Sequence, residues 1–95
     1  MVELREAVGN ATSYLSAVMD GKARDIRLEE IELSTDEQRW LVTLSALFPT
    51  PAFLVGPLGP GLEHLLRAAE QREYKTFTID SGSGTVRSMK IRTLP

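Results

Sequence analysis

The chain has 95 residues, of which 42% are hydrophobic and 25% are charged, and its net charge is −2. A chain of this length forms one domain, so residues 1–95 are expected to share a single modest core. Eleven basic against thirteen acidic residues are too balanced for a nucleic-acid-binding domain, which is usually basic. The absence of cysteine excludes a disulfide framework and thiolate metal ligands, and a single histidine excludes a site built from histidines alone.

The sequence predicts neither a targeting segment nor a membrane span. Charges stand at Glu3, Arg5 and Glu6, and no apolar run of signal-peptide length follows them. The most hydrophobic stretch, residues 44–58, is interrupted by three prolines and is shorter than the roughly 20 residues of a membrane helix. We therefore expect a cytoplasmic protein without a membrane partner.

An amphipathic helix is predicted over residues 2–19. Apolar residues recur there at spacings of three and four, which places them on one side of a helix. Glu3 and Glu6 lie in the first turn and basic residues follow the last one, an order that complements the helix dipole. Gly21 then offers the left-handed backbone that ends many helices. The predicted apolar stripe consists of Leu4, Ala7, Val8, Ala11, Leu15 and Val18.

Residues 24–33 and 39–47 are predicted to form an antiparallel hairpin around a polar turn at 34–38. The second strand carries apolar residues on both faces, which is typical of a central strand. In the first strand the apolar residues change parity half-way, and a β-bulge at residues 29–30 would return them to one face. These apolar residues are Ile26, Leu28, Ile31 and Leu33.

The segment 48–61 contains four of the five prolines and three of the seven glycines, so continuous regular structure is excluded there. Its apolar side chains are nevertheless too numerous for a solvated linker. We expect them either to close over the sheet as a lid or to form a partner-binding patch. Residues 61–72 are predicted to form a short helix after this insert. The candidate partner-binding residues are Phe53, Leu54, Val55 and Leu58.

Residues 73–79 and 85–91 are predicted to form a second hairpin around Asp80–Gly84, whose glycines can adopt positive φ. Val86 has the opposite parity to the apolar residues after it, which implies a second bulge or a change of side. The order of elements predicts an α+β fold in which the N-terminal helix packs on a four-stranded antiparallel sheet. The Pro/Gly-rich insert and its short helix stand between the second and third strands.

One helix can cover only one face of such a sheet. Alternation places Leu41, Leu47 and Tyr74 on the second face, with Val86 or Met89 as further candidates. Pairing of two chains through this face or through an open sheet edge, with the insert around Phe53 to Leu58 taking part, predicts a homodimer. The core predicted on the first face comprises Leu4, Val8, Ala11, Leu15, Val18, Ile26, Leu28, Trp40, Val42, Leu44, Phe77 and Ile79.

The helix followed by strands, together with the segment from Tyr74 to Val86, resembles a PepSY-like, broadly cystatin-like domain of small bacterial proteins. Those domains typically end with a strand, a turn of pattern Asp-x-x-Thr-Gly-x-Val and a last strand. The resemblance covers residues 2–47 and 72–93 and leaves out the insert. It implies a non-catalytic module, often attached to or inhibiting proteases. The matching positions are Asp80, Gly84 and Val86, and Ser83 stands where a threonine is usual.

Residues that suggest chemistry have simpler structural explanations. His64 alone titrates near neutrality unaided, and it is predicted on the polar side of the short helix. Ser81 and Ser83 lie in a turn that lacks the spacing of a nucleophile elbow and precedes a strand, whereas a phosphate loop precedes a helix. No catalytic, metal-binding or cofactor-binding residue is therefore assigned, and no cofactor is expected.

Charged residues cluster on the first hairpin and on the last strand. The acidic cluster lacks the spacing of a calcium loop, and we expect it to keep an exposed strand from pairing with other chains. The basic residues of the last strand form either cross-strand ion pairs or a small basic stripe. The acidic cluster comprises Glu29, Glu30, Glu32, Asp36 and Glu37, and the basic residues are Arg87, Lys90 and Arg92.

The sequence favours a small non-enzymatic protein-interaction module that binds itself, as a homodimer, or another protein. Two alternatives stay open. One is a cystatin-like cone that binds a small ligand or acts as an enzyme, with a pocket closed by residues 48–61. Buried polar residues lining such a pocket would favour it. The other is an antitoxin- or immunity-type inhibitor.

Overall fold

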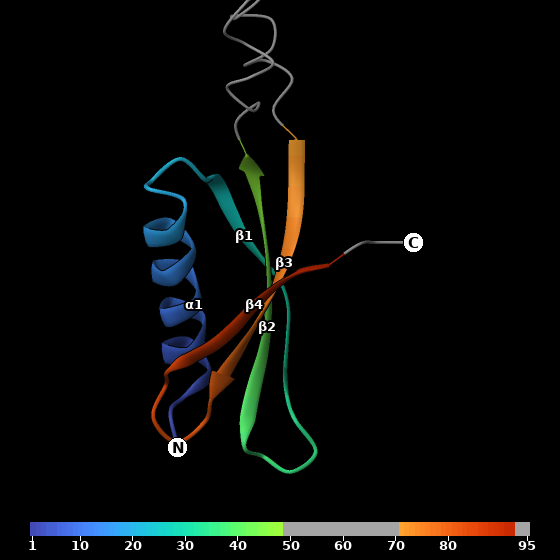
Figure 1. Ribbon diagram of the computed structural model, residues 1–95. Helices are drawn as coiled ribbons and strands as arrows, with labels where there is room; N and C mark the ends of the chain where they lie inside the picture. Colours follow the sequence, from blue (N-terminus) through green and yellow to red (C-terminus); the bar gives the residue numbers. More distant parts are fainter. Residues whose placement is uncertain (49–70, 93–95) are drawn as a thin grey trace, which may run out of the picture.

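The computed structural model describes residues 1–48 and 71–92. They form one helix and a four-stranded antiparallel sheet with the strand order β1-β2-β3-β4, which confirms the α+β class (Figure 1). The helix lies along one face of the sheet, and β1 and β4 are its edge strands. The elements are α1 (Leu4–Val18), β1 (Arg24–Leu33), β2 (Arg39–Phe48), β3 (Gln71–Asp80) and β4 (Val86–Arg92).

Two of the sequence predictions fall mainly outside the described residues. The insert predicted at 48–61 lies outside the described residues except for Phe48, which ends β2. Residues 61–70 of the predicted helix at 61–72 also lie outside the described residues. Its last two residues belong to β3 instead of a helix. Gln71 pairs with Phe48 and Arg72 pairs with Leu47, so cross-strand hydrogen bonding to β2 replaces the local helical pattern there.

Helix α1 packs on the sheet through the line Ala7, Ala11 and Leu15, whose side chains are fully buried. The i, i+4 spacing forms a single ridge along the helix, and the two alanines allow its backbone to approach the sheet closely. The prediction that Leu4 and Val18 belong to the core is wrong, since both are exposed. They occupy the first and last positions of α1, beyond the ridge that contacts the sheet.

Both parity changes in the sequence correspond to irregularities of the sheet. The β1–β2 register shifts between Leu28 and Glu30, as predicted, and again between Arg24 and Arg27. In β4 the extra residue is Arg87, because Ser88 and Val86 pair with consecutive residues of β3. A β-bulge of this kind restores the side chains beyond it to the original face.

The second bulge decides where the apolar residues of β4 point. Val86 is opposite Ile79 and Met89 is opposite Phe77, so both lie on the face covered by α1 and pack against the core. The suggestion that one of them lies on the second face is wrong. Leu28, predicted in the core, is exposed because it lies on the edge strand β1. The fully buried sheet residues include Val42, Leu44, Ala46, Phe77 and Ile79.

The N-terminus and the predicted turn at Asp80–Gly84 are tied together at one end of the sheet. The backbone nitrogen of Val2 donates to the carbonyl of Ser81 at 2.6 Å, and the indole nitrogen of Trp40 donates to the carbonyl of Val2 at 3.2 Å. Asn10 of α1 donates to the carbonyl of Gly84 at 2.8 Å. The turn therefore anchors both Val2 and the helix.

Candidate functional site

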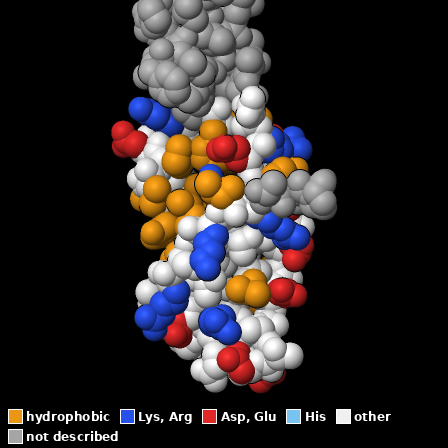
Figure 2. Space-filling model, turned by 45° about the vertical axis from the view of Figure 1, so that its right-hand side comes forward, with side chains coloured by type: hydrophobic (Ala, Val, Ile, Leu, Met, Phe, Trp, Pro, Cys, Tyr) orange, Lys and Arg blue, Asp and Glu red, His pale blue; other side chains and the backbone are white. Residues whose placement is uncertain are grey.

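Ile91 on β4 and Val18 at the end of α1 are among the most exposed large apolar side chains of the described residues. Val18 follows Tyr14 by one helical turn, and Ile91 follows Met89 on the same side of β4. The ring of Tyr14 meets Phe77 edge-on at 6.2 Å, and Phe77 is the cross-strand neighbour of Met89. We call Tyr14, Val18, Met89 and Ile91 the β4 rim. Figure 2 shows hydrophobic side chains gathered in one area of the surface, on the left of the view.

Exposure of the β4 rim is high for apolar residues in an ordered helix and strand. The exposed fraction is 74% for Ile91, 50% for Val18 and 40% for Tyr14, whereas Met89 is half-buried. Single exposed apolar residues are normal, but a group of them beside a sheet edge marks a surface that a partner can cover.

The two edge strands differ in charge and regularity. Strand β4 pairs only with β3 among the described residues and carries three basic residues and no acidic one. Strand β1 carries four acidic and two basic residues, and its register shifts twice. Asp25 in β1 also has a positive φ of 50°, which distorts the backbone further. Strand β4 has a single register shift, at Arg87. The second shift and the positive φ therefore make β1 the more irregular edge, and irregularity of this kind protects an edge against pairing.

The opposite face of the sheet, away from α1, is lined by hydroxyl and charged groups. Ser45 is 0% exposed and Thr43 is 3% exposed. Ser45 Oγ accepts from Arg72 Nη1 at 2.8 Å and donates to Glu29 Oε1 at 2.8 Å. Thr43 Oγ1 accepts from Arg92 Nη1 at 3.1 Å. These contacts satisfy both buried hydroxyls.

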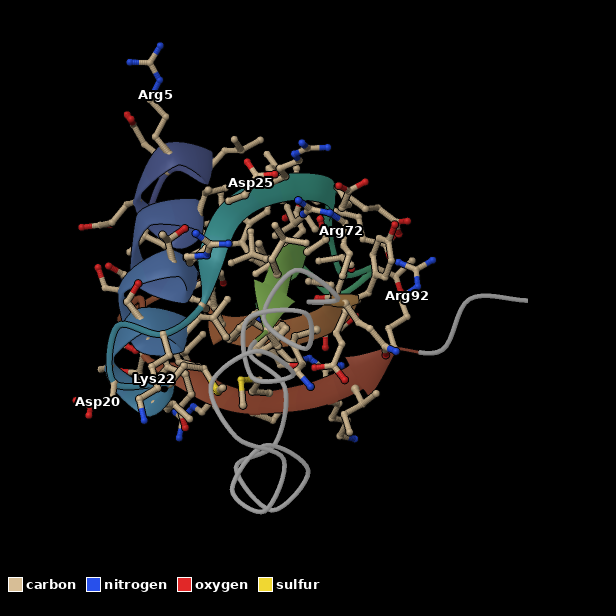
Figure 3. The ribbon with its side chains drawn as sticks, turned by 90° about the horizontal axis from the view of Figure 1, so that it is seen from above. Arg5, Asp20, Lys22, Asp25, Arg72 and Arg92 are labelled. Atoms are coloured by element: carbon tan, nitrogen blue, oxygen red, sulfur yellow. The ribbon has the colours of Figure 1, made fainter. Side chains whose placement is uncertain are left out.

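Two arginines fasten the edge strand β1 from across the sheet. Arg72 of β3 forms an ion pair with Asp25 and also donates to its backbone carbonyl at 3.1 Å. Arg92 of β4 pairs with Glu30 at 3.0 Å. Figure 3 shows Arg72 and Arg92 on the side of the sheet opposite α1. Hydrogen bonding from Arg27, supported by the positive charges of Arg27 and Arg72, holds the pKa of Asp25 below its usual range.

Two of the three basic residues of β4 form ion pairs, which is one of the two arrangements expected from the sequence. Arg92 forms its cross-strand pair with Glu30, and Arg87 pairs with Asp80 at 3.2 Å. Lys90 is exposed and has no ion-pair partner among the residues that the structure describes.

The serines of the predicted turn serve the turn itself. Ser81 Oγ donates to the carbonyl of Glu37 at 2.7 Å, and Ser83 Oγ donates to Thr85 Oγ1 at 2.9 Å. Asp80 Oδ1 accepts from the backbone nitrogens of Ser83 and Gly82, both at 2.9 Å. The Ser83 hydrogen bond, the Arg87 guanidinium and the Gly82 hydrogen bond lower the pKa of Asp80 to about 2.

The acidic residues do not converge. Asp36 accepts hydrogen bonds from Ser34 Oγ and the backbone of Gln38 within the first hairpin turn, which lowers its pKa, the Ser34 bond most. Glu29 and Glu30 are engaged on β1. Over residues 1–48 and 71–92, no group of three histidine, cysteine or carboxylate residues is placed to hold a metal ion.

The partner-binding residues predicted from the sequence, Phe53, Leu54, Val55 and Leu58, lie outside the described residues, as does His64. The β4 rim was not predicted as a site. Its sequence signal is the last strand itself, where Met89 and Ile91 alternate with basic residues.

Comparison with known proteins gives no relative for the chain, since no family model, no curated protein and no solved structure matches it. The likeness to PepSY-like domains therefore rests on the residues of the chain alone. Within the part of the chain that the structure describes, no helix is both long and apolar enough to cross a membrane.

Proposed function

We propose that the protein is a small non-enzymatic module that binds another protein through the β4 rim. The observation that carries this proposal is Ile91, which is 74% exposed on an edge strand that pairs on one side only among the described residues. Burying one such side chain in an interface is worth about 1.5–3 kcal/mol. Tyr14 of α1 lies near this strand, because it meets Phe77, the cross-strand neighbour of Met89, and Val18 follows one helical turn later.

The polar face of the sheet supports a binding role over catalysis. A general base or nucleophile must direct a lone pair or proton at its substrate. The buried hydroxyls of Ser45 and Thr43 are instead engaged by arginines and neighbouring oxygens. Among the described side chains, no buried nitrogen or oxygen lacks a hydrogen-bond partner. The non-catalytic character implied by the resemblance to PepSY-like domains agrees with this.

The second face offers less apolar surface than the β4 rim. Leu41, Leu47 and Tyr74 do lie there, as predicted, but they are half-buried. The rim residues Val18 and Ile91 are both at least 50% exposed. This difference favours the rim as the place where a partner protein binds.

Replacing Val18 and Ile91 together by aspartate is expected to abolish partner binding without unfolding the protein. Both side chains are exposed, so the charges meet water in the free protein but would be desolvated in an interface. The measurement is affinity capture of the stoichiometric partner from cell extract. The variant should capture at least about tenfold less of this partner than the wild type does.

Leu4→Asp provides the matched control. Leu4 is 44% exposed, lies at the other end of α1, and takes an acidic substituent well at a helix N-terminus. Far-ultraviolet circular dichroism checks that all three proteins are folded. Unchanged capture by the Val18→Asp, Ile91→Asp variant, or equal loss with Leu4→Asp, would contradict the proposal.

A further inference from the structure

We infer that β4 binds its partner by strand addition, and that the added segment alternates acidic and apolar residues. This inference rests on the proposed function and specifies the binding mode at the same surface. A strand at a sheet edge presents unpaired backbone groups along its outer side. An extended segment that pairs with them gains affinity from the backbone and specificity from alternate side chains.

The side chains of β4 define what the added strand must carry on each face. On the face of α1, Met89 and Ile91 offer an apolar surface, since they pair with Phe77 and Lys75 of β3. On the opposite face, Lys90 and Arg92 offer positive charge. Cross-strand neighbours on one face contact each other directly. The partner therefore places apolar residues beside Met89 and Ile91 and acidic ones beside Lys90 and Arg92.

The charge of β4 determines the sign of the charge that the partner segment must carry. Lys90 is exposed without an ion-pair partner among the described residues. The paired Arg92 and Arg87 side chains are still 39% and 62% exposed. Opposite charges stabilise adjacent strands, whereas like charges directly opposite destabilise them. An acidic segment is attracted to this edge, and a basic one is repelled.

The same charges disfavour a second copy of the chain as the occupant. Two β4 strands side by side would bring together three basic residues from each strand with no acidic residue between them, and like charges on adjacent strands destabilise the pairing. Strand β1 is acidic, but two register shifts make its backbone irregular. Its Glu30 is held by Arg92 of its own chain at 3.0 Å. The occupant is therefore an extended segment of a different protein.

Peptide titration of the full-length protein, followed by amide resonances in nuclear magnetic resonance spectra, tests the inference. The probe is a peptide of about eight residues that alternates glutamate and valine. The comparison peptide alternates lysine and valine. We expect the glutamate peptide to shift the β4 resonances and slow their amide exchange, and the lysine peptide to leave them unchanged.

Two variants of β4 and one control refine the test. Lys90→Glu should weaken binding of the glutamate peptide about two- to fivefold and allow the lysine peptide to bind. Ile91→Asp should weaken it about tenfold or more. Arg5→Glu makes the same change of charge as Lys90→Glu, but Arg5 points away from the sheet (Figure 3), and it should bind like the wild type.

Three results would overturn strand addition: no shift of β4 at about 1 mM peptide, equal shifts with both peptides, or self-association of the free protein through β4. If one of these occurs while the Val18→Asp, Ile91→Asp variant still loses its captured partner, the proposed function stands without this binding mode. If the capture is also unchanged, both fail.

Discussion

Replacing Leu15 with alanine is expected to lower the free energy of unfolding by about 2–5 kcal/mol, as truncation of a buried leucine does. Of the three buried residues of α1, Leu15 is the only one larger than alanine. It belongs to the same buried cluster as Val42, Leu44 and Phe77. This change therefore truncates the largest fully buried side chain of α1. Chemical denaturation of both proteins measures the difference.

The control is Leu4→Ala, which makes the same chemical change at an exposed position of the same helix. Its expected cost is below about 1 kcal/mol, because little apolar surface leaves water at this site. A loss of less than half a kcal/mol for Leu15→Ala would mean that α1 does not pack on the sheet through this residue.

Replacing Gly84 with alanine is expected to cost about 2–4 kcal/mol, from two separate effects. Gly84 has a φ of 79°, which a side chain tolerates poorly. A Cβ atom there would also stand 2.8 Å from Asn10 Nδ2 and 3.3 Å from Val2 Cγ1. The turn would have to move away from α1 and from Val2. Thermal and chemical denaturation report the loss.

Gly21→Ala separates the two effects. Gly21 has a similar φ of 72°, but nothing lies within 4 Å of the Cβ position, so only backbone strain of about 1–2 kcal/mol is expected. The clash at Gly84 is relieved when Asn10 is truncated. Gly84→Ala should therefore cost less in an Asn10→Ala background than alone. Equal costs for Gly84→Ala and Gly21→Ala would show that the close approach of Asn10 contributes nothing.

The sheet could be predicted closely because its signals are local. The parity change between Leu28 and Ile31 predicted the bulge that the β1–β2 register shows. The parity of Val86 indicated either a bulge or a change of side, and the structure has a bulge at Arg87. The alternation of apolar and polar residues along a strand indicates which face each side chain occupies. A break in this alternation therefore locates a bulge. The helix boundaries followed equally from the apolar spacing and from Gly21.

Burial at the ends and edges of elements could not be predicted in the same way. Leu4, Val18 and Leu28 have the right periodicity for the core but are exposed, because periodicity gives a direction and not the extent of the partner surface. Ile91 is exposed for the same reason, since no further strand stands beside β4 among the described residues.

The arginine pairs on the second face depend on contacts far apart in the sequence. Arg72 meets Asp25 from 47 positions away, and Arg92 meets Glu30 from 62 positions away. Any basic residue on one strand could pair with any acidic residue on another until the register is known. These pairs form a polar network on the second face, beside the half-buried Leu41, Leu47 and Tyr74.

Amide hydrogen exchange in the free protein tests the openness of β4 most directly. In an edge strand, alternate backbone amides point toward the neighbouring strand and away from it. We expect alternate amides of β4 to exchange rapidly, while those of β2 and β3, which are paired on both sides, are protected throughout. Uniform protection along Val86–Arg92, as slow as in β2, would show that the edge is already covered and would contradict its role as a binding strand.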